Sequence, residues 1–176
     1  MVNPFKAAIV ALLAVNAVYF AVADTASKAL DAGAWLVLLI LFEIETAYGD
    51  RLRKGRRRLF VRAARAAAVT AVIVAAVGYL FENNLLDAVN SALWIAVVLL
   101  LEFEVRLPQI VARGRTVFAV TATTLYAGLG VLVIVWAALG AWFDAYDAAL
   151  WLIAFATLEL DVIRLTPDRT RTETPV

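Results

Sequence analysis

The stretch Trp35-Leu-Val-Leu-Leu-Ile-Leu-Phe-Glu43-Ile-Glu45 decides the fold, because the chain repeats its pattern twice more. The pattern returns from Trp94 to Glu104 and from Trp151 to Asp161. Each copy is a Trp, seven apolar or small residues, a Glu, one apolar residue and a second acid. The Trp residues are 59 and 57 positions apart. A repeat of this length predicts an architecture of three similar units.

The composition indicates that the chain lies in a lipid bilayer. Hydrophobic residues make up 64% of the sequence and the mean hydropathy is +0.86, whereas soluble domains contain about 45–50% apolar residues. Such a chain has too little polar surface to cover a water-soluble globule. Cys and His are both absent, which excludes disulfides, thiol nucleophiles, imidazole bases, haem ligation through His, and thiolate or His-bound metal sites.

Six apolar segments, two in each unit, predict an all-α integral membrane protein. The first runs from Phe5 to Ala23 and meets the ~20-residue length that a helix needs to cross a hydrocarbon core. We expect six transmembrane helices as three helical hairpins with pseudo-threefold packing. The hairpins occupy residues 1–58, 59–115 and 116–165, and a polar cytoplasmic tail covers 166–176. An alternative for the first segment is a signal peptide, with Lys6 in its basic region.

The sequence also predicts where these helices begin, bend and touch. Acidic turns are expected at 24–33, 82–90 and 144–147, so that the second helix of each unit begins near its Trp. The fifth segment, 116–143, would be ~42 Å long as a straight helix and should tilt or kink near Gly128 and Gly130. A stripe of small residues on the third segment predicts a close helix contact; it consists of Ala63, Ala67, Ala71 and Ala75.

Charged residues are segregated between the two ends of the expected helices. The acidic turns contain one basic residue, Lys28, whereas the other 15 lie at the opposite ends or in the tail. A basic run such as 51–58 can bind nucleic acid, but between two membrane segments we favour a cytoplasmic anchor and expect no nucleic-acid partner. The positive-inside rule then places both termini in the cytoplasm and the acidic turns outside, in a cytoplasmic (inner) membrane.

The acids that follow each Trp are the candidate functional residues. If the Trp marks the outer boundary of a ~30 Å hydrocarbon core, the first acid lies ~12 Å and the second ~15 Å deeper, near the midplane. Carboxylates at that depth are costly and normally face protein or water. Because a helix turns by ~200° over two residues, only one acid of each pair can face a common axis. The ion-binding candidates are Glu43, Glu45, Glu102, Glu104, Glu159 and Asp161.

Arg residues near these acids are candidate counter-charges. Arg106 is four residues after Glu102, a spacing that brings side chains together on a helix surface. Arg164 is three residues after the last acid of the third unit and has the same relationship to it. The first unit lacks a local cation, and Arg62 and Arg65 on the third segment are the residues that could supply one.

Three classes of function follow from these features. Converging carboxylates would form a channel or transport site for a proton or a hard divalent metal such as Mg²⁺, Ca²⁺ or Mn²⁺. Buried Glu–Arg networks would instead belong to a non-catalytic scaffold or accessory subunit of a membrane complex. An enzyme is the least favoured class. Apart from a hard cation, no cofactor is expected; the expected partners are the lipid bilayer and either further copies of the chain or a larger membrane complex.

Overall fold

The computed structural model describes residues 4–52 and 56–165, with side chains described at 4–45 and 56–157. Within these residues the regular structure is entirely helical, as the sequence predicted. Six helices have 20 or more residues and one has 6. They are α1 (Pro4–Ala23), α2 (Ala26–Leu52), α3 (Arg56–Phe81), α4 (Leu85–Arg106), α5 (Pro108–Arg113), α6 (Arg115–Ala138) and α7 (Trp142–Leu165).

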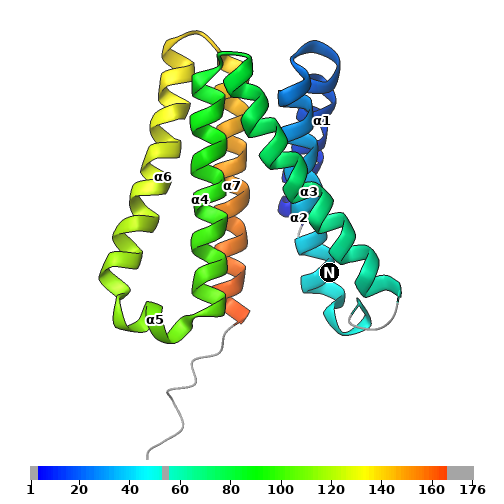
Figure 1. Ribbon diagram of the computed structural model, residues 1–176, viewed down its shortest axis with the longest axis vertical. Coiled ribbons are helices and arrows are strands. Elements are labelled where there is room, and N and C mark those ends of the chain that lie inside the picture. Colours follow the sequence, from blue (N-terminus) through cyan, green and yellow to red (C-terminus); the bar gives the residue numbers. More distant parts are fainter. Residues whose placement is uncertain (1–3, 53–55, 166–176) are drawn as a thin grey trace, which may run out of the picture.

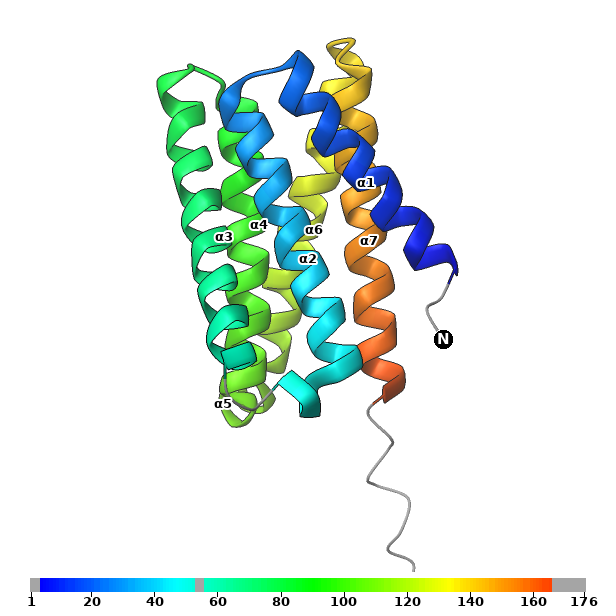
Figure 2. The ribbon, with the colours of Figure 1, turned by 90° about the vertical axis from the view of Figure 1, so that its right-hand side faces the viewer.

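The long helices form a bundle whose tight turns lie at one end. Figure 1 shows the α1–α2, α3–α4 and α6–α7 connections together at the top of the molecule, and α5 at the bottom. Each long helix packs against the next along the chain, α4 against α6 across the short α5, and α1 also contacts α7. The last contact, which can be followed in Figure 2, closes the six long helices into a ring.

Local sequence explains why these turns are so short. Asn83 and Gly140 adopt the left-handed backbone conformation, with φ of 55° and 78°, and Asn and Gly tolerate it best. After each of them, a backbone hydrogen bond that spans five residues ends the helix. These bonds run from Asn84 N to Tyr79 O and from Ala141 N to Trp136 O, and both are 2.9 Å long. This Schellman geometry satisfies the last carbonyls of α3 and α6 and reverses the chain within a few residues.

Four helices in the described part of the chain are long and apolar enough to cross a membrane: α1, α3, α4 and α6. The outer surface of the bundle is apolar as well. Val22, Phe81 and Val105 are 84%, 83% and 79% exposed, and many other large hydrophobic side chains face outward with them. A helix that is apolar on its outward as well as its inward side suits lipid better than water. These features indicate a membrane protein.

The core of the bundle contains three Trp residues among aliphatic side chains. Trp35 on α2, Trp94 on α4 and Trp151 on α7 are all buried in it. The ring centroid of Trp94 lies 6.4 Å from that of Trp35 and 4.5 Å from that of Phe155. These Trp rings therefore face the interior of the bundle and not its outer surface. α2, α4 and α7 each begin nine residues before their Trp, because the polar residues expected in turns form the first helical turns instead.

The structure also differs from the expectations for the fifth segment and for the stripe of small residues. The fifth segment was expected to be 28 residues long and to tilt or kink, but α6 is one continuous helix that ends at Ala138, after 24 residues. Gly128 allows a close approach instead, since a Cβ there would lie 3.3 Å from the Leu93 side chain on α4. The small-residue stripe is also only partly right: Ala75 is buried, whereas Ala63 and Ala67 are exposed and the packed face of α3 follows Val61, Ala68, Val72, Ala75 and Tyr79.

Candidate functional site: a lysine among aspartates

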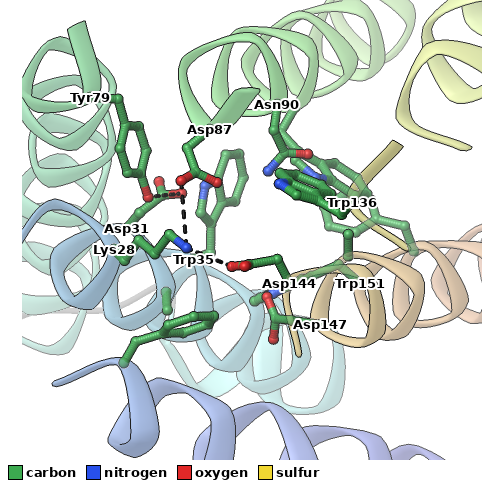
Figure 3. Close-up of a pocket in the computed structure, with 15 residues that line it drawn as sticks. Lys28, Asp31, Trp35, Tyr79, Asp87, Asn90, Trp136, Asp144, Asp147 and Trp151 are labelled. Carbon is green, nitrogen blue, oxygen red and sulfur yellow. Dashed lines mark hydrogen bonds and ion pairs between the residues drawn. The ribbon is translucent and has the colours of Figure 1, made fainter. Parts of the chain in front are cut away.

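The most polar part of the interior lies near the end of the bundle where the tight turns are. Lys28, on the first turn of α2, points between α4 and α7. Its Nζ lies 2.6 Å from Asp144 Oδ1 on α7, 3.6 Å from Asp87 Oδ2 on α4 and 3.3 Å from Asp24 Oδ2 in the turn before α2. The Lys28 side chain is only 12% exposed. Figure 3 shows this ammonium group between Asp87 and Asp144.

Two further aspartates lie beside this group and do not bind Lys28. Asp31, one turn further along α2, accepts a 3.3 Å hydrogen bond from the Tyr79 hydroxyl on α3. Asp147, one turn further along α7, accepts a 2.6 Å hydrogen bond from the Asn16 amide on α1. We call Lys28, Asp31, Asp87, Asp144 and Asp147 the Lys–Asp cluster. Its members come from α2, α4 and α7, and they bring four carboxyl groups against one ammonium group.

A cavity of about 50 Å³ opens among these residues. All five members of the Lys–Asp cluster line it, and the remaining walls are largely aromatic. Figure 3 shows Trp35, Trp136 and Trp151 around the charged groups. The aromatic lining residues are Phe20, Trp35, Tyr79, Trp94, Trp136, Trp151 and Phe155. Charged groups therefore meet aromatic faces in a small space inside the bundle.

Some polar atoms in the cavity wall lack a well-formed hydrogen bond. Asp31 Oδ1, Trp35 Nε1 and Asn90 Oδ1 are buried and complete no hydrogen bond of normal geometry with the described residues. Asp31 and Trp35 are each 8% exposed. An unsatisfied buried donor or acceptor costs about 1–3 kcal/mol. The wall of the cavity thus retains both accepting and donating capacity.

The members of the Lys–Asp cluster occupy related sequence positions that the sequence analysis did not use. Lys28, Asp87 and Asp144 each precede the Trp of their unit by seven residues. Asp31, Asn90 and Asp147 precede it by four. On a helix, the first set therefore lies about two turns before the Trp, and the second set about one turn before it. Reading the repeated pattern backward from each Trp would have found them. Their distances from one another could not be read from the sequence.

The acids predicted to bind an ion lie elsewhere. Glu43 and Glu102 are 17 residues into α2 and α4, which is ~26 Å along each helix and well past its middle. Glu43 Oε1 lies 3.1 Å from Lys6 Nζ, Glu45 pairs with Arg65, and Glu102 Oε1 lies 2.5 Å from Arg106. Their side chains are 36%, 34% and 53% exposed.

These acids do not gather into one site in the described part of the chain. Glu104 and Arg62 are exposed, and Glu43, Glu45 and Glu102 each pair with a different basic residue. No group of three or more acidic residues with metal-binding geometry occurs among the described side chains. The remaining candidates, Glu159, Asp161 and Arg164, lie outside the residues whose side chains are described, as does the tail 166–176.

Comparison with known proteins adds no assignment. No protein-family model matches the chain, and neither a curated protein nor a solved structure matches it. The chemistry of the Lys–Asp cluster is therefore the main indication of function.

Proposed function

We propose that the chain is a multi-pass transporter that binds a small cation at the Lys–Asp cluster. The observation that carries the proposal is the charge of the cavity: four aspartates line it and a single lysine opposes them. A cation entering the cavity would meet more carboxyl groups than ammonium groups inside the bundle, where electrostatic attraction is stronger than in bulk water. Ionisable groups among membrane helices commonly mark ion or substrate pathways.

The topology that we propose has six crossings arranged as three hairpins around a pseudo-threefold axis. The contact of Lys28 with Asp87 and Asp144 supports it, because these three residues hold equivalent positions in the three units. α2 and α7 have 27 and 24 residues, so they are also long enough to cross the membrane, which takes about 20 residues. The positive-inside rule supports cytoplasmic termini in the cytoplasmic membrane, with the Lys–Asp cluster toward the outer face.

A transporter fits the cluster better than an open channel. Lys28 connects α2 to α4 and α7 through ion pairs at the place where a pore would run. A cation could pass only if this lysine moved or exchanged its partners, which implies a bound intermediate. The acid pairs at the far end of the same helices, Glu43 with Glu45 and Glu102 with Glu104, remain candidates for a second cation position.

A scaffold or accessory subunit of a membrane complex is the second candidate. The same ion pairs favour it, because a lysine that satisfies carboxyl groups on two neighbouring helices also fixes how the three helices pack. In that case the cavity would be a by-product of packing, and no cation would stabilise the protein.

Thermal stability in detergent separates the two functions. We expect a transportable cation to raise the melting temperature of the wild-type protein, since a ligand that binds only the folded state stabilises it. The rise should disappear in an Asp31→Asn, Asp147→Asn double variant, and it should persist in Glu82→Gln. Glu82 lies at the same end of the bundle but does not line the cavity. If protons, alkali ions, Mg²⁺, Ca²⁺, Mn²⁺ and ammonium ions all leave the wild-type stability unchanged, the transport proposal is wrong.

A further inference from the structure

The ligand class can be inferred from the atoms of the cavity wall, given the cation-binding function proposed above. Asp31 is the most informative residue. Its carboxyl group is buried in the cavity wall; one oxygen accepts the Tyr79 hydroxyl, and the other, beside the Trp35 indole, completes no hydrogen bond of normal geometry with the described side chains. A buried carboxylate oxygen that faces a cavity and lacks a well-formed hydrogen bond is a place for a ligand that donates a hydrogen bond, carries positive charge, or does both.

The aromatic walls of the cavity restrict the chemical class of the ligand further. Trp35, Trp94, Trp136 and Trp151 all line the cavity, and the first two lie with ring centroids 6.4 Å apart. Aromatic faces attract cations through the ring quadrupole, Trp most strongly, and several rings around one carboxylate are the usual recognition device for organic ammonium ions. Rings contribute no ligand to a hard metal ion, which prefers six or more oxygen atoms.

Lys28 shows that this environment accommodates an ammonium group. Its Nζ contacts the carboxyl groups of Asp87 and Asp144 and lies 5.6 Å from the centroid of the Phe20 ring. The protein thus already holds one alkylammonium group between carboxylates and an aromatic face. Asp31 and the Trp rings provide a second carboxyl group and further aromatic faces in the wall of the same cavity.

The same contacts disfavour a divalent metal. The described side chains contain no group of three or more acidic residues with the geometry of a metal site. Lys28 occupies the space between Asp87 and Asp144 that a metal would need, and its charge would repel a divalent ion. A monovalent ion with an apolar part avoids both difficulties.

We propose that the cavity binds a small organic ammonium ion, with Asp31 as its counter-charge and the Trp rings as its walls. The size of the cavity limits the ligand. About 50 Å³ is far below the roughly 300–1,000 Å³ of pockets for drug-sized molecules. The ligand is therefore a primary amine or methylated ammonium ion with few carbon atoms.

Tryptophan fluorescence provides the test, because four of the five Trp residues of the chain line the cavity. The full-length protein in detergent is titrated with methylammonium and tetramethylammonium chloride, with Mg²⁺, Ca²⁺ and Mn²⁺ chlorides, and with neopentane, the neutral isostere of tetramethylammonium. Sodium chloride keeps the ionic strength constant. We expect a saturable change in fluorescence with at least one ammonium ion and none with the neutral compound.

Two pairs of variants locate the site. Asp31→Asn should weaken ammonium binding by about tenfold or more, since each tenfold corresponds to ~1.4 kcal/mol and loss of a buried charge partner exceeds that. Glu82→Gln, which removes a charge at the same end of the bundle, should not. Trp94→Phe should weaken binding and reduce the fluorescence response, whereas Trp142→Phe should leave the affinity unchanged because Trp142 is 70% exposed and lies outside the cavity.

The outcomes separate this inference from the broader function. Binding of ammonium ions that depends on Asp31 and Trp94 supports both. Binding of a divalent metal or an alkali ion without ammonium binding overturns the ligand class and leaves a cation site in place. Equal binding of the neutral isostere, or ammonium binding unaffected by Asp31→Asn, overturns the inference. If neither metal, alkali nor ammonium ions bind, both the inference and the proposed function fail.

Discussion

Lys28 Nζ lies 2.6 Å from Asp144 Oδ1, although 116 residues separate the two in the chain. The ion pair joins α2 to α7 in the polar part of an otherwise apolar bundle. Asp87 on α4 lies within 3.6 Å of the same nitrogen. One ammonium group therefore connects three of the six long helices, and its replacement should affect both stability and ligand binding.

The first prediction concerns Lys28→Ala. It leaves the carboxyl groups of Asp87 and Asp144 without their cation, and breaking a buried ion pair costs about 3 kcal/mol or more. We expect a lower melting temperature in detergent, partly restored by methylammonium, which can take the place of the missing side chain. Arg106→Ala should change stability little, because its ion pair with Glu102 is exposed. A Lys28→Ala protein as stable as wild type would contradict the role given to this lysine.

The second prediction concerns the contact that closes the helical ring. Asn16 on α1 is 3% exposed and donates to Asp147 on α7 at 2.6 Å. Asn16→Ala leaves a buried carboxyl oxygen without its donor, which should destabilise the protein by about 2 kcal/mol. Asn16→Asp should cost more, since it places two carboxyl groups together. Thermal unfolding measures both, and the opposite order of stabilities would argue against this hydrogen bond.

The third prediction distinguishes the packed face of α3 from its lipid-exposed face. Ala75 is 1% exposed, so Ala75→Leu must displace its neighbours and should destabilise the protein by about 2 kcal/mol, as overpacking does in other cores. Ala67 is exposed on the same helix, and Ala67→Leu should be neutral. Equal effects of the two substitutions in a detergent melting experiment would show that α3 has a different orientation.

The fourth prediction tests the proposed topology in cells. The chain contains no Cys, so single cysteines can be introduced at exposed positions without further changes. Cysteine in place of Thr25, Asn83 or Leu139, all at the tight turns, should react with a membrane-impermeant thiol reagent added outside. Cysteine in place of Ala112 on α5, at the other end, should react only after the membrane is opened. Outside labelling of the α5 position would reverse the orientation.

The helices could be predicted from the sequence because their signals are local. α1 ends at Ala23, as expected, and long apolar runs led to the other helices as well. The helix starts were misplaced because Asp31 and Asp87 were taken as turn residues. When its partner is not known, a polar residue in the first turns of a helix is easily assigned to the preceding turn instead. Lys28, Tyr79 and Asn16 supply those partners from distant parts of the chain.

The candidate site was harder to predict for the same reason. The acids after each Trp stood out because an apolar run surrounds them, yet Glu45 and Glu102 pair with exposed Arg residues far from the aromatic core. The acids before each Trp were less conspicuous, although the same repeat contains them. Only the packing of α2, α4 and α7 brings Asp87 and Asp144 to Lys28. The equivalent positions of these residues in the three units were visible in the sequence, whereas their approach to one another in space was not.

Uptake of labelled methylammonium into liposomes tests the central claim most directly. Wild-type protein, Asp31→Asn and Glu82→Gln are reconstituted at equal density, and each is first shown to be folded by its melting temperature. We predict saturable uptake with wild type and Glu82→Gln that exceeds the uptake by empty liposomes, and loss of this excess with Asp31→Asn. Uptake by a folded Asp31→Asn protein equal to that of wild type, or wild-type uptake no greater than that of empty liposomes, would contradict the account.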